Sequence, residues 1–81
     1  MITSAQIRAA RALLRWSSED LAREADLGPA TIRRLEVQEG VPSVHTRTLD
    51  LIQRALEDAG IEFLGSADDR PGVRLIKKQS Q

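Results

Sequence analysis

Apolar residues recur every three or four positions along the first three-quarters of this 81-residue chain. That spacing is typical of amphipathic helices, which turn one face toward a core. It predicts four helices, at about residues 4–14, 18–25 and 29–37, and from 44 or 46 to 59. The positions expected to face the core are Ile7, Ala10, Leu14, Leu21, Ala22, Ala25, Ile32, Leu35, Leu49, Ile52, Leu56 and Ala59.

Residues suited to helix ends interrupt this pattern. Thr3 with Gln6, and Ser17 with Asp20, have the three-residue spacing of a capping box, in which two side chains bond each other's backbone N–H groups. They predict where the first two helices begin. Asp26 tolerates a left-handed backbone better than most side chains, so we expect the second helix to end there.

The last part of the chain changes to a two-residue period, which is typical of strands. Residues 61–64 and 73–76 are rich in β-forming side chains, and residues 65–72 have a turn-forming composition. These features predict a β-hairpin with Glu62 and Arg74 paired on one face. Residues 77–81 are expected to be a frayed end. The other face of the hairpin would carry Ile61, Phe63, Val73 and Leu75.

An isolated two-stranded hairpin is only marginally stable in water, so its apolar face needs cover. The same hairpin of a second chain could supply that cover, together with hydrogen bonds along a strand edge. We therefore expect a homodimer interface formed by Ile61, Phe63, Val73 and Leu75. The alternative is that the hairpin folds back onto the helices of its own chain.

The composition excludes several classes of protein. The chain has no cysteine and one histidine, so one chain can form neither a disulfide nor a zinc site built on several imidazoles. The absence of cysteine fits a cytoplasmic protein, and no apolar run could cross a bilayer or serve as a signal-peptide core. No nucleophile–base constellation or glycine-rich phosphate loop is present, so we expect no enzymatic activity, cofactor or metal.

The formal net charge is zero, from twelve basic and twelve acidic residues, whereas most nucleic-acid-binding domains are basic. The distribution of charge matters more than its sum, because counterion release depends on the face that is presented to phosphates. Residues 31–35 are locally basic, with Arg33 and Arg34 adjacent. A neutral chain can therefore still carry a basic interface on its third predicted helix.

The two short helices at 18–25 and 29–37 are joined by a tight turn and carry the candidate chemistry. Ala22 is small enough for the two helices to approach, and Ile32 and Leu35 can anchor the second helix from behind. A helix about 10–12 Å across fits a major groove about 12 Å wide. The exposed side of that helix carries Pro29, Ala30, Thr31, Arg33 and Arg34.

Residues 5–60 resemble the XRE-type helix-turn-helix family, the fold of the lambdoid phage repressors and Cro proteins. The matching stretches are residues 11–17, 19–22, 30–36 and 42–43. The resemblance implies a mostly α, four- to five-helix lambda-repressor-like DNA-binding domain over residues 1–60, with a C-terminal β-hairpin and tail at 61–81. It also implies a transcriptional regulator, usually a repressor, that reads a palindromic operator as a homodimer.

The resemblance further implies which residues contact double-stranded DNA. Base-reading positions are occupied by Pro29, Ala30, Thr31 and Arg34. Phosphate-contacting positions are occupied by Ser18, Ser43, His45, Thr46 and Arg47. The predicted DNA-binding set also includes Gly28 and Arg33. Arg11 and Glu36 match a pair that in relatives ties the first helix to the end of the third.

Several of these residues also have a simpler interpretation. Arg34 can bond guanine O6 and N7 through its forked guanidinium, or it can belong to a solvated helix face. Arg33 can contact phosphate or nothing, and Thr31 can contact a thymine methyl or bond within its own helix. His45 can contact phosphate or be an ordinary loop residue. Trp16 is expected in the core, between the first two helices.

A second function is compatible with the neutral charge and the β-forming tail. The hairpin could add a strand to a protein partner, as in an antitoxin or an antiactivator. Substitution of Arg34 separates the two functions, because only a DNA reader would lose operator binding.

Overall fold

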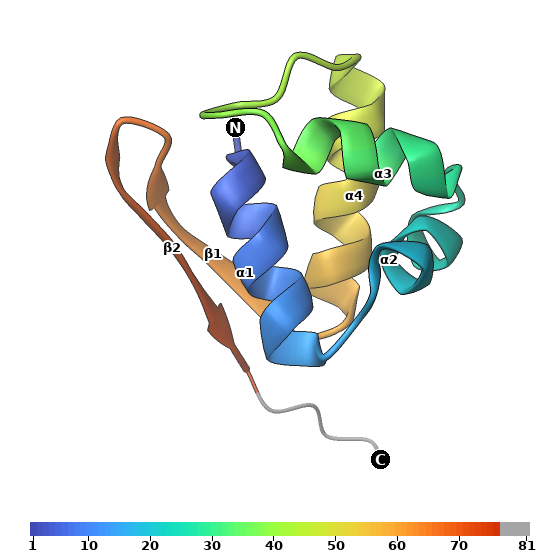
Figure 1. Ribbon diagram of the computed structural model, residues 1–81. Coiled ribbons are helices and arrows are strands. Elements are labelled where there is room, and N and C mark those ends of the chain that lie inside the picture. The colour runs from blue at the N-terminus through green and yellow to red at the C-terminus, as the bar shows by residue number, and fades with distance from the viewer. Residues whose placement is uncertain (77–81) are drawn as a thin grey trace.

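A computed structural model describes residues 1–76, which fold into four helices followed by a two-stranded antiparallel hairpin (Figure 1). The mostly helical fold class predicted from the sequence is therefore confirmed. The frayed end predicted at residues 77–81 lies outside the described residues. The elements are α1 (Ser4–Leu14), α2 (Ser18–Ala25), α3 (Pro29–Glu36), α4 (Thr46–Asp58), β1 (Ile61–Ser66) and β2 (Asp69–Leu75).

Both predicted capping boxes are present. The Thr3 side chain accepts from the Gln6 backbone N–H at 3.0 Å, and the Gln6 side chain accepts from the Thr3 N–H at 2.9 Å. Ser17 and Asp20 form the same reciprocal pair at 3.0 and 2.8 Å. The pKa of Asp20 is lowered from its ordinary value, mainly by the hydrogen bond from the Ser17 N–H and next by the hydrogen bond from Arg23. Each box satisfies N–H groups that have no partner inside the helix.

The junctions between helices follow the expected backbone chemistry. Asp26 adopts a left-handed conformation with φ 60° and ends α2, as predicted. The next residue, Leu27, donates its N–H back to the carbonyl of Ala22 at 2.8 Å, which closes the end of the helix. Helix α3 ends at Glu36, one residue before the predicted end, because Val37 caps it.

The core lies where the four helices and the start of β1 meet. Its fully enclosed side chains come from every helix, and the largest are Ile7, Leu21, Ile32, Leu35, Leu49, Ile52 and Leu56. These are the positions that the helical spacing placed inside. Trp16 and Leu14 were also predicted in the core, and both are half-buried side chains packed against its rim.

The hairpin has the predicted register. Ile61 pairs with Leu75 and Phe63 with Val73, while Arg74 donates to Glu62 at 2.9 Å on the other face. Ile61 is buried, and Phe63 and Val73 are half buried against the core of the same chain. The hairpin therefore folds back onto its own helices, and Leu75, at 42% exposure, is the member of the predicted interface most open to solvent.

Gly65 is required where the two strands approach the hairpin tip. Its φ is 71°, and a Cβ built there would lie 2.2 Å from the backbone oxygen of Arg70. A larger side chain would have to displace backbone, and the register shifts between Leu64 and Ser66 at this point. The glycine thus permits the irregularity that closes the hairpin.

One side chain of α1 fastens the hairpin to the helices. The amide nitrogen of Gln6 donates to the carbonyl of Leu64 at 3.1 Å and to the carbonyl of Gly72 at 2.8 Å. These two carbonyls belong to paired residues of β1 and β2. Gln6 is 4% exposed, so both bonds form away from bulk water, where leaving a group unpaired is costly.

We predict that Gln6→Glu destabilises the protein by about 1–3 kcal/mol. The carboxylate can still accept from the Thr3 N–H and preserve the capping box, but it cannot donate to the two strand carbonyls. Urea unfolding monitored by circular dichroism measures the effect. An unchanged unfolding midpoint would show that the amide donor is dispensable.

Candidate DNA-binding surface

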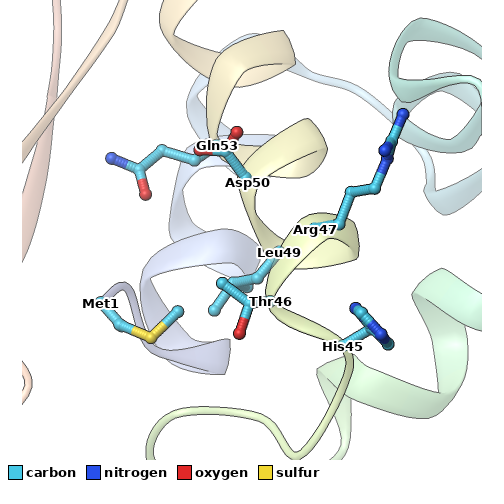
Figure 2. A pocket seen from close by; sticks show the side chains of 7 residues that line it. All are labelled: Met1, His45, Thr46, Arg47, Leu49, Asp50 and Gln53. Atoms are coloured by element: carbon cyan, nitrogen blue, oxygen red, sulfur yellow. The ribbon is translucent and has the colours of Figure 1, made fainter.

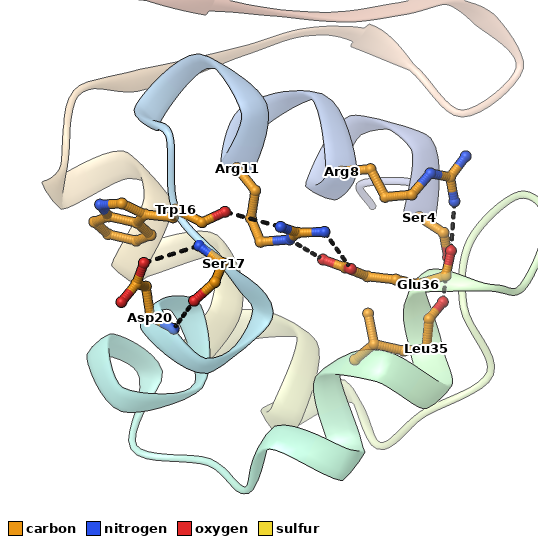
Figure 3. Close-up of polar contacts among 8 residues, drawn as sticks. All are labelled: Ser4, Arg8, Arg11, Trp16, Ser17, Asp20, Leu35 and Glu36. Atoms are coloured by element: carbon orange, nitrogen blue, oxygen red, sulfur yellow. Dashed lines mark hydrogen bonds and ion pairs between the residues drawn. The ribbon is translucent and has the colours of Figure 1, made fainter.

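Helix α3 is held at its C-terminal end by side chains of α1. The Ser4 hydroxyl donates to the Leu35 carbonyl at 2.7 Å, and the Arg8 guanidinium donates to the Glu36 carbonyl (Figure 3). The last carbonyls of a helix have no partner within it. Two polar side chains of a neighbouring helix therefore satisfy this end of α3 and fix its position.

The predicted pair of Arg11 and Glu36 completes this anchor. The guanidinium donates to both carboxylate oxygens, at 2.7 and 2.8 Å, and to the carbonyl of Trp16 at 2.8 Å (Figure 3). The Glu36 side chain is 7% exposed and that of Arg11 is 21% exposed. The hydrogen bond with Glu36 raises the pKa of Arg11. This forked pair joins α3 to α1 and to the start of the α1–α2 connection.

The N-terminal end of α3, by contrast, has no side-chain cap. Gly28 is its N-cap residue, with no side chain to bond the first-turn amides, and Pro29 follows at the first helical position. A Cβ built on Gly28 would meet nothing within 4 Å. The backbone at this end can therefore be approached closely from outside, at the positive end of the helix dipole.

The two sides of α3 differ as the helix-turn-helix interpretation requires. Ile32 and Leu35 are fully buried, and Thr31 is half buried. The exposed residues of the other side are Pro29, Ala30, Arg33 and Arg34. These four residues form the outer side of α3.

The two arginines on the outer side of α3 have different surroundings. Arg33 donates to the carboxylate of Glu19, in the first turn of α2, at 3.1 Å. Arg34 forms no hydrogen bond or ion pair with any residue of the described part of the chain, 1–76. Reasoning from sequence did not find the partner of Arg33, because it lies fourteen residues away on another helix.

The start of α4 supplies a second group of predicted DNA contacts. His45 is its N-cap residue without a side-chain cap bond, and no acidic residue lies in the first turn. Thr46 and Arg47 follow and are exposed. Met1, His45, Thr46 and Arg47 are among the residues that line a groove of about 670 Å³ (Figure 2).

The remaining predicted contacts lie close to these helix starts. Ser18 is half buried in the first turn of α2. Ser43 is exposed in the loop before α4, and its N–H donates to the Gln38 side chain at 2.7 Å. The predicted set is thus distributed over the outer side of α3, the first turn of α2 and the start of α4.

Two other features are absent from residues 1–76. No group of three or more histidine, cysteine, aspartate or glutamate side chains in this part of the chain could hold a metal ion. None of its helices has both the length and the apolar character needed to cross a membrane.

A helix whose inner side is buried and whose outer side is exposed, braced by a second short helix across a tight turn, defines a helix-turn-helix domain. The family model described as Helix-turn-helix matches residues 7–57, more than half of the chain. The chain therefore belongs to this family, the XRE-type or lambda-repressor-like helix-turn-helix proteins, whose members are DNA-binding transcription regulators. Neither the curated proteins nor the solved structures contain a significant match to it.

Proposed function

We propose that the protein is a homodimeric, sequence-specific regulator that represses transcription by occupying a palindromic operator. The observation that carries this proposal is the outer side of α3. The C-terminal end of α3 is anchored to α1, the inner side of this helix is buried, and Arg34 on its outer side has no partner in residues 1–76. A rigid helix with a free guanidinium is suited to insertion into the major groove.

The other predicted contacts have complementary roles in this proposal. Arg34 bonds guanine O6 and N7, and Pro29 and Ala30 contact bases through apolar atoms such as a thymine methyl. Thr31 is half buried, so only the exposed part of its side chain is available for the proposed contact with a thymine methyl. The backbone at Gly28 approaches the DNA closely. The proposed phosphate contacts are Ser18, Ser43, His45, Thr46 and Arg47, which position the domain without reading sequence.

A selection of binding sites from a random duplex pool tests the proposal directly. The selected sites should contain two inverted half-sites, because a dimer with a two-fold axis presents α3 twice. We expect the logarithm of the binding constant to fall linearly with the logarithm of salt concentration, with a slope of about −0.9 per phosphate contact. Binding that does not respond to salt, or a selection without a consensus, would contradict groove binding.

The hairpin is the proposed dimer element, although its own chain already covers part of the predicted interface. Ile61 is buried, and Phe63 and Val73 pack partly against the core. Leu75 remains open, and Ile76 beside it is 52% exposed. The proposed contact between chains therefore centres on the end of β2.

We predict that the protein sediments as a dimer and that Leu75→Asp converts it to a monomer. A carboxylate at this position would be desolvated without a partner in the dimer. Analytical ultracentrifugation measures the change, with circular dichroism to confirm that the fold is retained. The matched control is Val41→Asp, which introduces the same charge at a similarly exposed loop residue and should leave the dimer intact.

One observation also favours the alternative of a protein-binding module. The N–H of Ile76 donates to the Gly60 carbonyl at 2.6 Å, so Ile61 and Leu75 form a pair that is not hydrogen-bonded to each other. The backbone groups of Val73 and Leu75 then point away from β1. This strand edge could accept another strand, as in an antitoxin or antiactivator. Partner binding by that edge would persist when Arg34 is replaced.

A further inference from the structure

The ion pair between Arg33 and Glu19 lies on the proposed DNA-binding surface itself. Glu19 follows Ser18 in the first turn of α2, and Ser18 is one of the proposed phosphate contacts. Arg33 lies on the outer side of α3, next to Arg34, which has no partner in residues 1–76. The pair therefore places a carboxylate where the rest of the surface is expected to meet phosphates.

The geometry of this pair favours exchange. A single Nη1–Oε2 contact of 3.1 Å joins the two groups, and their side chains are 56% and 60% exposed. Exposed pairs of this kind contribute little to stability, because water competes for both charges. By contrast, the forked Arg11–Glu36 pair has two contacts and a carboxylate that is 7% exposed. The Arg33–Glu19 pair is thus a poor candidate for holding the fold.

We propose that Glu19 competes with DNA phosphate for Arg33 and thereby weakens sequence-independent binding of DNA. This inference rests on the proposed function. Non-specific affinity comes essentially from neutralised phosphates, and Arg33 can neutralise one only when it leaves Glu19. Arg34 has no such competitor within residues 1–76 and remains available to read a base. Weak non-specific binding matters because the genome presents a vast excess of competing sites.

The test measures binding of a short random-sequence duplex by fluorescence anisotropy over a series of salt concentrations. Glu19→Gln should bind several-fold more tightly at low salt, with a salt slope that is steeper by about 0.9, because one phosphate contact is gained. Arg33→Gln added to Glu19→Gln should return both quantities to the wild-type values. Arg33→Gln alone should bind no more tightly than the wild type, because it releases the Glu19 carboxylate without adding a phosphate contact.

Glu24→Gln is the matched control, because it makes the same charge change on the same helix. Glu24 is exposed and has no hydrogen bond or ion pair within residues 1–76, so it restrains no arginine. We expect its salt slope to match that of the wild type. The inference is overturned if Glu24→Gln and Glu19→Gln have equal effects, or if Arg33→Gln does not reverse the gain.

These outcomes are distinct from a failure of the proposed function. If the wild-type protein shows no salt-dependent binding to any duplex, the proposed function falls and this inference falls with it. If the wild type binds a selected operator through Arg34 but Glu19→Gln binds random DNA no better, the inference alone is wrong.

Discussion

Replacing Arg34 with alanine should weaken binding to the selected operator by about 1–3 kcal/mol, or roughly five- to 150-fold. The guanidinium is exposed on α3 and has no polar partner in residues 1–76. No internal contact is therefore broken by the substitution, and the expected loss is that of a bidentate contact to guanine. Titration of a labelled operator measures it, and a random-sequence duplex should show a far smaller loss.

The comparison of two arginines makes this prediction specific. Arg54→Ala removes the same charge from an exposed position in the C-terminal half of α4, where Arg54 pairs with Asp50 at 3.2 Å. Arg54 lies outside the proposed DNA-binding set, so the operator affinity of the Arg54→Ala protein should stay close to that of the wild type. Equal losses for Arg34→Ala on operator and random DNA would identify Arg34 as a phosphate contact instead of a base reader.

The features that sequence predicted correctly depend on a few neighbouring residues. A capping box needs only a hydroxyl and an acceptor three positions apart, as at Ser17 and Asp20. The left-handed end of α2 depends on Asp26 alone. The strand register agrees with the predicted pairing of Glu62 and Arg74, which places Ile61 opposite Leu75.

The features that sequence could not predict depend on how distant elements cross. Alternation assigned Ile61 to an apolar face, but the choice between cover from α4 and cover from a second chain is a matter of three-dimensional packing. The reach of Gln6 to carbonyls of both strands likewise spans 58 and 66 residues. The contact of Arg33 with Glu19 depends on the angle between α2 and α3, which no short motif encodes.

The outcome for the candidate site reflects the same division. The helical period placed Arg33 and Arg34 on the exposed side of α3, with Ile32 and Leu35 inside, and the structure has this arrangement. The helical period predicts that both adjacent arginines are exposed, but it does not predict which residues surround each of them. Only the three-dimensional structure distinguishes a guanidinium held by Glu19 from one with no partner in residues 1–76.

Replacing Arg11 with alanine should destabilise the protein by about 3 kcal/mol or more, because the substitution leaves the buried Glu36 carboxylate without its counter-charge. It also removes the donor to the Trp16 carbonyl. Single domains are stable by only about 5–15 kcal/mol, so a loss of this size is large. Urea unfolding measures it, and operator binding should weaken as well, because α3 loses part of its anchor.

Two further variants decide whether the unpaired charge is the cause. Arg23→Ala breaks an exposed pair with Asp20, whose side chains are 67% and 35% exposed, and should cost no more than about 1 kcal/mol. Combining Arg11→Met with Glu36→Leu removes both charges, and apolar replacements of a buried pair are often neutral or stabilising. We therefore expect the double variant to be more stable than Arg11→Ala. If it is equally unstable, the loss comes from packing or from the Trp16 contact, and the charge of Glu36 is not responsible.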